Sequence, residues 1–337
     1  MQAVRSLVDV TRAQQVESWH GGVMVIARAS GELVGVVGDP AETVFPRSAV
    51  KIIQALPLIE TGAADRFRFS DMELALACAS HIGAPGHVAA VDALLHRLGL
   101  AHGALACGAH PPIGEAARNA LIRSGQAPSP LHNNCSGKHA GMLATAVHLN
   151  EGVEGYELAG HPVQARIRSV FSDVAGVDLA GVVPGIDGCS VPNWPLPIDR
   201  LAVAFARIVS GEGLEGARAR AFRRLLDACW AQPEAMAGEG RFETGLLKRF
   251  RGEVFVKGGA EGVSCGGIRS QAVGFAIKVN DGTQRAAEKA VGAILARLIE
   301  GAEDLGKPSI LTNAAGVAVG DVRAGAALIA VLDSISV

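Results

Sequence analysis

Residues 23–38 read VMVIARASGELVGVVG and decide how the chain begins to fold. Two apolar runs rich in β-branched residues flank a turn at Ser30 and Gly31, which is the pattern of a β-hairpin. Two comparable runs occur near the other end of the chain, at residues 253–259 and 271–282. Because all of these strands need partners, we expect them to join in one antiparallel sheet.

The stretch between these strands predicts helices, because alanine and leucine dominate it and glycine or proline separates its segments. A strongly periodic helix is also predicted over residues 284–301. The sequence therefore predicts an α/β (α+β) fold, with an antiparallel sheet built from both chain ends and flanked by the first and last helices. We expect a single domain, residues 1–337, with a sheet lobe of about residues 1–65 and 250–337 and a central helical lobe of about residues 66–249. A binding site is expected in the cleft between the lobes.

The composition excludes several classes of function. Hydrophobic residues make up 49% of the 337 residues and the mean hydropathy is +0.28, as in globular proteins. No window reaches the roughly 18 unbroken apolar residues of a membrane-spanning helix, and residues 1–20 are too polar for a secretory signal. We therefore expect a cytoplasmic protein without a membrane partner. With 31 basic and 33 acidic residues, the chain has no field that would hold nucleic acid, so a small-molecule substrate is favoured.

Six cysteines are spread along the chain without CxxC or Cys/His spacing. Without an export signal, a disulfide framework is not expected, and most of these residues should be buried thiols. Their spacing alone indicates no metal site.

The strongest local motif is a Ser-x-x-Lys in residues 46–51, PRSAVK, at the predicted start of a helix. Ser48 and Lys51 would share one helix face, close enough for the amine to accept the serine proton. The chain has only seven lysines, and lysine, unlike arginine, can lose its proton and act as a base. The alternative is an N-cap serine followed by a surface lysine.

A second lysine motif, Lys257-Gly258-Gly259, ends a predicted strand. Serine acyl-transferases of the penicillin-binding type combine a Ser-x-x-Lys helix with a Lys-[Ser/Thr]-Gly strand. Here Gly258 replaces the hydroxyl residue, and no Ser-Asp-Asn occurs, so a β-lactam substrate is disfavoured. The alternative for Lys257 is a surface lysine beside a flexible turn.

Two polar clusters remain, HNNCSGKHAGM at residues 132–142 and GIDGCS at residues 185–190. Cys135 and Lys138 would face the same way from a helix start, and with Cys189 they could bind a borderline cation such as zinc. The alternative is that both cysteines simply fill the core.

Six segments together resemble the Rhizobium-type L-asparaginases, also called the thermolabile or asparaginase II class. Their fold is similar to that of serine β-lactamases and glutaminases. The segments extend over most of the chain and read PRSAVKIIQALPL, ACASHIGAPGHVAAV, LACGAHPP, HNNCSGKHAGMLA, GIDGCSVPNWPLP and KGGAEGV.

The resemblance implies roles for individual residues and a homodimer. It makes Ser48 the nucleophile beside Lys51, and it pairs Ser80 with Lys257 as a second Ser-Lys couple. Arg47 and His139 flank the motifs and are candidates for binding the charged α-groups of the substrate. The implied zinc ligands are Cys135, Lys138 and Cys189. Asp187 is expected to lie next to a metal-bound water and to bind the substrate.

The expected reaction is hydrolysis of L-asparagine to L-aspartate and ammonia through a Ser48 acyl-enzyme. A lysine base works only when its surroundings bring its pKa to roughly 7–8. A glutaminase or another serine amidohydrolase on the same fold is the alternative enzyme, since one methylene is worth only about 1–3 kcal/mol of discrimination. A non-enzymatic zinc-binding or ligand-sensing protein is the alternative from another class.

Overall fold

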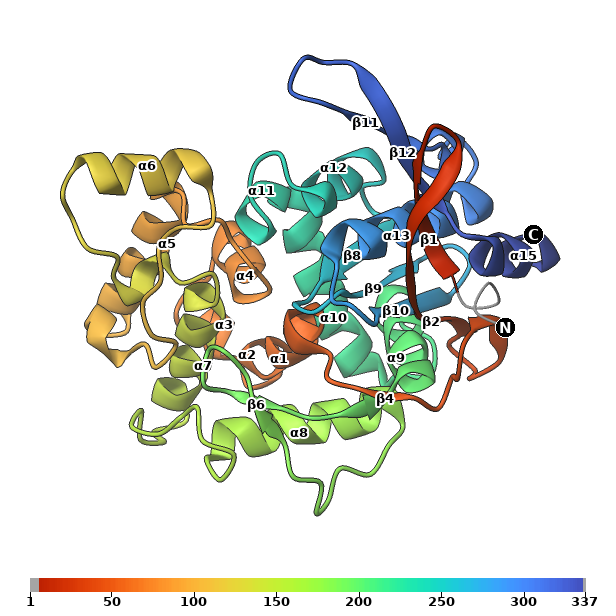
Figure 1. The fold of residues 1–337 in the computed structure, drawn as a ribbon. Helices are drawn as coiled ribbons and strands as arrows, with labels where there is room; N and C mark the ends of the chain where they lie inside the picture. The colour runs from red at the N-terminus through yellow and green to blue at the C-terminus, as the bar shows by residue number, and fades with distance from the viewer. Residues whose placement is uncertain (1–5, 336–337) are drawn as a thin grey trace. The chain divides into compact units, whose positions relative to one another are not determined.

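The computed structural model describes residues 6–335 of the chain, and it divides into two compact units, which are described separately (Figure 1). One contains the large sheet and is called the sheet unit; the other is called the helical unit. Among the described residues, the sheet unit comprises 6–49, Leu196–Ser210 and 257–335, and the helical unit comprises Val50–Pro195 and Gly211–Val256.

An eight-stranded sheet forms the centre of the sheet unit, in the order β11-β12-β1-β2-β10-β9-β8, with β3 paired to β2. The long strand β2 joins the chain ends, because it pairs antiparallel with β1 and β3 and also with β10. The strands are β1 (Ser6–Arg12), β2 (Gln15–Arg28), β3 (Leu33–Val37), β8 (Val254–Gly258), β9 (Val263–Ile268), β10 (Val273–Val279), β11 (Ser309–Thr312) and β12 (Ala318–Ala324), and a separate small ladder pairs β4 (Thr43–Val44) with β7 (Leu196–Pro197).

Helix α9 (Ile198–Ser210) lies directly against the sheet at two glycines. Gly267 on β9 and Gly274 on β10 are opposite each other. A Cβ on Gly274 would lie 2.1 Å from the carbonyl oxygen of Ala202, and one on Gly267 would lie 2.8 Å from a methyl group of Val209. Only glycine permits this approach, so these strand positions determine where α9 packs.

Two helices near the C-terminus complete the cover of the sheet. Helix α13 (Gln284–Leu298) packs on β10, β9, β1 and β12, and α15 (Ala326–Ser334) packs on β1 and β3. The short α14 (Glu303–Gly306) packs on α13. Among residues 6–335, no helix is long and apolar enough to span a bilayer.

The helical unit is a cluster of mostly short helices (Figure 1). The helices are α1 (Lys51–Gln54), α2 (Leu56–Glu60), α3 (Ala63–Arg66), α4 (Asp71–Ala77), α5 (Pro85–Arg97), α6 (Glu115–Arg123), α7 (Ser136–His148), α8 (Pro162–Ala175), α10 (Gly216–Ala231), α11 (Pro233–Met236) and α12 (Phe242–Arg249), with 3₁₀ turns η3 (His102–Ala104) and η4 (Pro130–His132) and a small ladder of β5 (Gly185–Ile186) and β6 (Pro192–Asn193).

The start of α7 is pressed against the end of α4. A Cβ on Gly137 would lie 2.4 Å from the carbonyl oxygen of Leu76, so the two backbones approach as closely as glycine allows. The backbone N–H of His81 also donates to the Asn134 carbonyl at 3.3 Å. These contacts bring the segment after α4 next to the segment before α7.

The predicted α/β (α+β) class, with an antiparallel sheet made from both chain ends, is confirmed. Three segments group differently from the expected lobes: residues 50–65 and 250–256 belong to the helical unit, and residues 196–210, which include α9, belong to the sheet unit. Strand β9 was not predicted, since its two glycines lower its β-propensity. The helix expected after Pro46 is broken into a 3₁₀ turn and two short helices.

Candidate functional site

Lys51 is the first residue of α1, and its side chain is buried. Its Nζ donates hydrogen bonds to the carbonyl of Ala79 at 2.5 Å, to the Oγ of Ser80 at 2.9 Å and to the carbonyl of Asn134 at 3.3 Å. Three neutral oxygens therefore surround the amine. Sequence analysis paired Lys51 with Ser48 and Ser80 with Lys257; the structure shows a hydrogen bond between Lys51 and Ser80, and the two expected pairings stay predictions.

The backbone around Ser80 is anchored on both sides. Its N–H donates to the carbonyl of Met236 at 3.1 Å, and the following N–H, that of His81, donates to Asn134. The same Asn134 carbonyl accepts from Lys51, so one oxygen ties the Ser80 segment and the amine together. Ser80 thus lies in a segment fixed from α11 and from the approach to α7.

His81 is a buried neutral imidazole beside this amine. The N–H of Gly83 donates to its Nδ1 at 3.1 Å, so the ring proton is on Nε2, which donates to the Oγ of Ser136 at 2.8 Å. Burial, followed by the positive fields of His87 and Lys51, holds the pKa of His81 well below its usual value. The sequence analysis did not single out His81, although it directly follows Ser80.

Cys135, Lys138 and Cys189 come together in the helical unit, and all three side chains are buried. Nζ of Lys138 lies 3.0 Å from Sγ of Cys189, and the two thiol groups are hydrogen-bonded to each other. Cys135 is the N-cap of α7 and Lys138 is in its first turn, which gives the shared face that the spacing predicted. Cys189 comes from the loop between β5 and β6.

The charges in this cluster support one another. The hydrogen bond from Cys189 lowers the pKa of Cys135 well below its usual value, and the same bond, together with burial, raises the pKa of Cys189. Burial opposes the charge on Lys138, but attraction to the two sulfurs outweighs it and raises the pKa of Lys138. These interactions favour the charged form of Lys138, and they favour a thiolate at Cys135 over one at Cys189.

Asp187 lies in the same β5–β6 loop and acts on this cluster. Its charge contributes to raising the pKa of Lys138. Its backbone N–H donates to Val191 at 2.9 Å and its carbonyl accepts from Ser190 at 2.9 Å, so a tight turn holds it. Ser190 has a φ of +73°, a backbone conformation that is uncommon for residues other than glycine.

His139 is fully buried beside Lys138 and contacts the chain's only tyrosine. Its Nδ1 lies 2.6 Å from the hydroxyl of Tyr156, and the two rings meet edge to face. Burial, followed by the charges of Lys138 and Lys51, holds the pKa of His139 well below its usual value. Sequence analysis missed Tyr156, because no motif contains it. The one signal in the sequence was that the chain has a single tyrosine.

Arg47 and Ser48 belong to the sheet unit, in the 3₁₀ turn η2 (Arg47–Val50). The N–H of Ala49 donates to the carbonyl of Pro46 at 3.2 Å and closes this turn. Arg47 has a φ of +52°, and such left-handed residues often occur at functional sites. Ser48 is half-buried.

The end of β8 lies against this turn within the sheet unit. A Cβ on Gly259 would lie 2.8 Å from the carbonyl oxygen of Pro46 and 3.1 Å from the nitrogen of Ala49. The neighbouring Lys257 is buried, and its Nζ donates to the carbonyl of Gly258 at 2.9 Å. The Lys-Gly-Gly motif is therefore next to the turn that carries Ser48, and Gly259 is required by this close approach.

The predicted site residues thus form two groups. The sheet unit brings the Lys-Gly-Gly strand end to the turn of Arg47 and Ser48. The helical unit contains a hydrogen-bonded Ser-Lys pair and, close to it, a cluster of polar side chains. That pair is Lys51 with Ser80, and the cluster is Cys135, Lys138, His139, Asp187 and Cys189.

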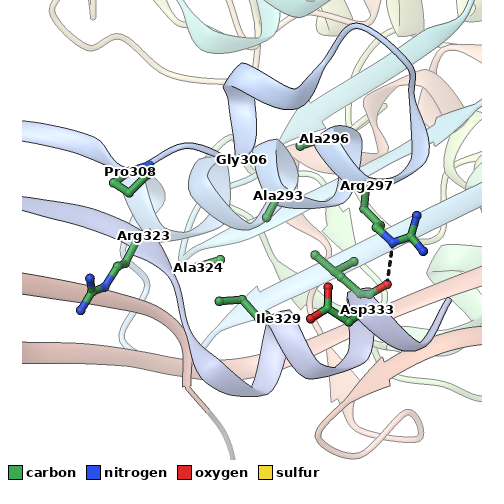
Figure 2. Close-up of a pocket in the computed structure, with 10 residues that line it drawn as sticks. Ala293, Ala296, Arg297, Gly306, Pro308, Arg323, Ala324, Ile329 and Asp333 are labelled. Carbon is green, nitrogen blue, oxygen red and sulfur yellow. Dashed lines mark hydrogen bonds between the residues drawn. The ribbon is translucent and has the colours of Figure 1, made fainter.

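Other parts of the described chain offer less chemistry. Within residues 6–335, no three His, Cys, Asp or Glu side chains gather so as to hold a metal ion; the cluster at α7 has two cysteines and a lysine. A pocket of about 380 Å³ lies between α13, β12 and α15 (Figure 2). Its lining is mostly alanine and other apolar side chains, and Arg297 at its rim donates to the carbonyl of Leu332 at 3.0 Å. It contains none of the predicted site residues.

Comparison with known families completes this description. The profile of the family described as L-asparaginase II matches residues 8–324. A comparison with curated proteins found no match. The family match extends over nearly all of the chain and includes both groups of site residues, so the chain belongs to the L-asparaginase II family and is a hydrolase that acts on amides.

Proposed function

We propose that this protein hydrolyses L-asparagine to L-aspartate and ammonia through a Ser48 acyl-enzyme with lysine as the base. Membership of the L-asparaginase II family supports the substrate. The observation that supports a lysine base is the buried Lys51 amine, 2.9 Å from the Ser80 hydroxyl and surrounded by neutral oxygens; Ser48 as the nucleophile rests on the Ser-x-x-Lys motif. An amine so placed can exchange protons with hydroxyl groups.

In this reaction, Oγ of Ser48 forms a bond to the side-chain amide carbon while its proton passes to Lys51. The bond from carbon to nitrogen then breaks, and the proton leaves with ammonia. A water molecule, deprotonated in the same way, cleaves the aspartyl ester and frees Ser48. Ser80 and Lys257 act as the second Ser-Lys couple, and the hydrogen bond from Lys51 to Ser80 gives the proton a path between hydroxyl groups.

The charged α-groups of asparagine need opposite charges and hydrogen-bonding groups. We assign the α-carboxylate to Arg47, because a guanidinium binds carboxylates in a bidentate manner. Asp187 supplies a negative charge for the α-ammonium group, and His139 supplies a hydrogen-bond donor. The support for these roles is that both residues lie by the Lys138 cluster.

The thiol cluster also fits a zinc ion. Cys135, Lys138 and Cys189 offer two sulfurs and a nitrogen that already contact one another, which is a donor set of the soft and borderline type that zinc prefers. When bound there, zinc would orient the substrate as a Lewis acid. The chain must release the proton of Lys138 to bind it, because only a neutral amine has a lone pair.

We further propose a cytoplasmic homodimer. All six cysteines are free, which suits a reducing compartment. Strand β11 forms one edge of the large sheet, and its Ile310 is 62% exposed, so this edge has main-chain groups and an apolar side chain available to a second copy. Sedimentation of the purified protein tests the dimer.

Ammonia release by purified protein, measured on L-asparagine, L-glutamine and a β-lactam, tests the proposed function. Asparagine should be turned over with a kcat/KM at least about tenfold above that for glutamine, which one methylene can provide. Faster turnover of glutamine would make the protein a glutaminase. Absence of ammonia from every amide would favour a zinc-binding or ligand-sensing protein.

A further inference from the structure

Tyr156 is a buried residue that forms hydrogen bonds through both its hydroxyl group and its backbone carbonyl. It is the only tyrosine of the chain and it is 1% exposed. Its hydroxyl oxygen accepts a hydrogen bond from the backbone N–H of Ala106 at 2.9 Å and lies 2.6 Å from Nδ1 of His139. Its carbonyl accepts from the side chain of Gln164 at 2.9 Å, so both ends of the residue are anchored.

These contacts determine which ring nitrogen of His139 carries the proton. The N–H of Ala106 can only donate, so it occupies one lone pair of the Tyr156 oxygen. The hydroxyl hydrogen is then free to point at Nδ1 of His139. If Nδ1 carried a proton instead, the buried hydroxyl hydrogen would lose this acceptor and be left unpaired, which is unfavourable. The favoured arrangement has Nδ1 as acceptor and the proton on Nε2.

The second ring nitrogen of His139, Nε2, lacks a well-formed hydrogen bond. It is buried, and no residue from 6 to 335 meets it with good hydrogen-bond geometry. The backbone carbonyl of Cys189, in the β5–β6 loop, acts on the ring as a hydrogen-bond acceptor and raises the pKa of His139, so a ligand at Nε2 would compete with this carbonyl. Lys138, the next residue, brings the ring to the thiol cluster. A buried N–H without a partner is costly unless a ligand accepts from it.

We propose that Tyr156 is a positioning residue that holds His139 in the tautomer with the proton on Nε2, so that the substrate meets a fixed N–H donor. The role of that donor in binding an oxygen of asparagine rests on the proposed function, whereas the tautomer itself does not. Tyr156 acts through His139 and does not touch the substrate. Fixing the donor before binding removes the cost of ordering it during binding.

Nuclear magnetic resonance of protein labelled with ¹⁵N-histidine tests the tautomer directly, because protonated and unprotonated ring nitrogens have different shifts. The His139 signals are identified by their loss in His139→Gln. Wild type should show one neutral tautomer, with the proton on Nε2. Tyr156→Phe should show a mixture of both. Gln164→Met is the matched control: it removes the hydrogen bond to the Tyr156 carbonyl, keeps the hydroxyl and should leave the wild-type signals.

Kinetics provide the second measurement. Tyr156→Phe should raise KM for asparagine about fivefold and leave kcat within about twofold, because a donor used in binding is no longer fixed. In a His139→Gln background, where the donor has no tautomers, Tyr156→Phe should add no further effect. A wild-type proton on Nδ1, or a Tyr156→Phe protein with unchanged tautomer, would overturn the proposal. Absence of asparagine turnover in wild type would refute the proposed function and leave the tautomer result intact.

Discussion

Ser48 is the proposed nucleophile and lies in the 3₁₀ turn η2. Arg47, the residue before it, has a left-handed backbone conformation. We expect Ser48→Ala to abolish ammonia release, because no acyl-enzyme can form without the hydroxyl. The protein should stay folded and still bind asparagine, as measured by calorimetry. Retention of more than a few per cent of wild-type turnover would contradict the scheme and make Ser80 the leading nucleophile.

Lys51 tests whether the amine acts as a base or only as a positive charge. We expect Lys51→Arg to reduce kcat by about a hundredfold or more, because arginine keeps the charge but cannot accept a proton. Lys248→Arg is the control, since Lys248 is an exposed lysine paired with Glu234. It should retain full ammonia release. Equal turnover in the two variants would show that Lys51 acts through its charge alone.

Lys138 decides between a metal ligand and a purely electrostatic partner of the thiolate. We expect about one zinc per chain in wild type and clear losses in Cys135→Ser, Cys189→Ser and Lys138→Arg, because arginine offers no lone pair. Zinc content should also fall in mildly acidic buffer, as protons compete for the sulfurs and the amine. Elemental analysis of the four proteins measures this. Equal zinc content in all four would leave the cluster without a metal role.

At the scale of elements, the contact between α4 and α7 positions both the Ser80 segment and the thiol cluster. We expect Gly137→Ala to lower the free energy of unfolding by about 1–3 kcal/mol, because its Cβ would overlap the Leu76 carbonyl and push α7 away. Gly245→Ala in α12 is the control, since nothing lies within 4 Å of a Cβ there. It should raise the free energy of unfolding by about 0.4–1 kcal/mol. Urea denaturation compares the two.

Contacts between elements also separate what could be predicted from the sequence from what could not. The helix start at Cys135 was readable, because Cys135 and Lys138 are three residues apart and share a helix face. The shared face of Ser48 and Lys51 stays a prediction, since the helix expected there is broken. The partner of Lys51 was not readable, since Ser80 is 29 residues away and meets the amine only through the packing of α1 and α4. Strand β9 was missed for a related reason, because Gly267 is required by the close approach of Val209 on α9 and weakens the strand pattern.

At the scale of the whole molecule, His81 should make stability depend on pH. Its pKa is lowered in the fold, whereas the unfolded chain binds a proton near the ordinary value of about 6.5. Stability is therefore complete above about pH 6.5 and falls as the pH drops below it, by at most about 1.4 kcal/mol per pH unit for one such group. Urea denaturation between pH 5 and 8 should show this slope, and His81→Asn should reduce it without removing it, because the pKa values of His139 and His87 are also lowered. The exposed His96→Asn should leave the slope unchanged.

The oligomeric state is also a property of the whole molecule. We expect sedimentation to return twice the chain mass of 34.6 kDa. Ile310→Lys on β11 should shift the protein toward the monomer, because an edge lysine opposes pairing of strands. A wild-type mass of a single chain would contradict the dimer.

The sequence by itself determined the fold class, the family and the motif residues. Strand alternation, helix periodicity and residue spacing act over a few neighbouring positions, and a linear reading captures them. Tertiary structure alone decided that Ser80 contacts Lys51 and that Tyr156 contacts His139, and it brings Cys189 to Lys138, a grouping that the sequence had suggested. These partners are 17 to 51 residues apart, and buried polar groups find partners wherever packing leaves them, regardless of their distance along the chain.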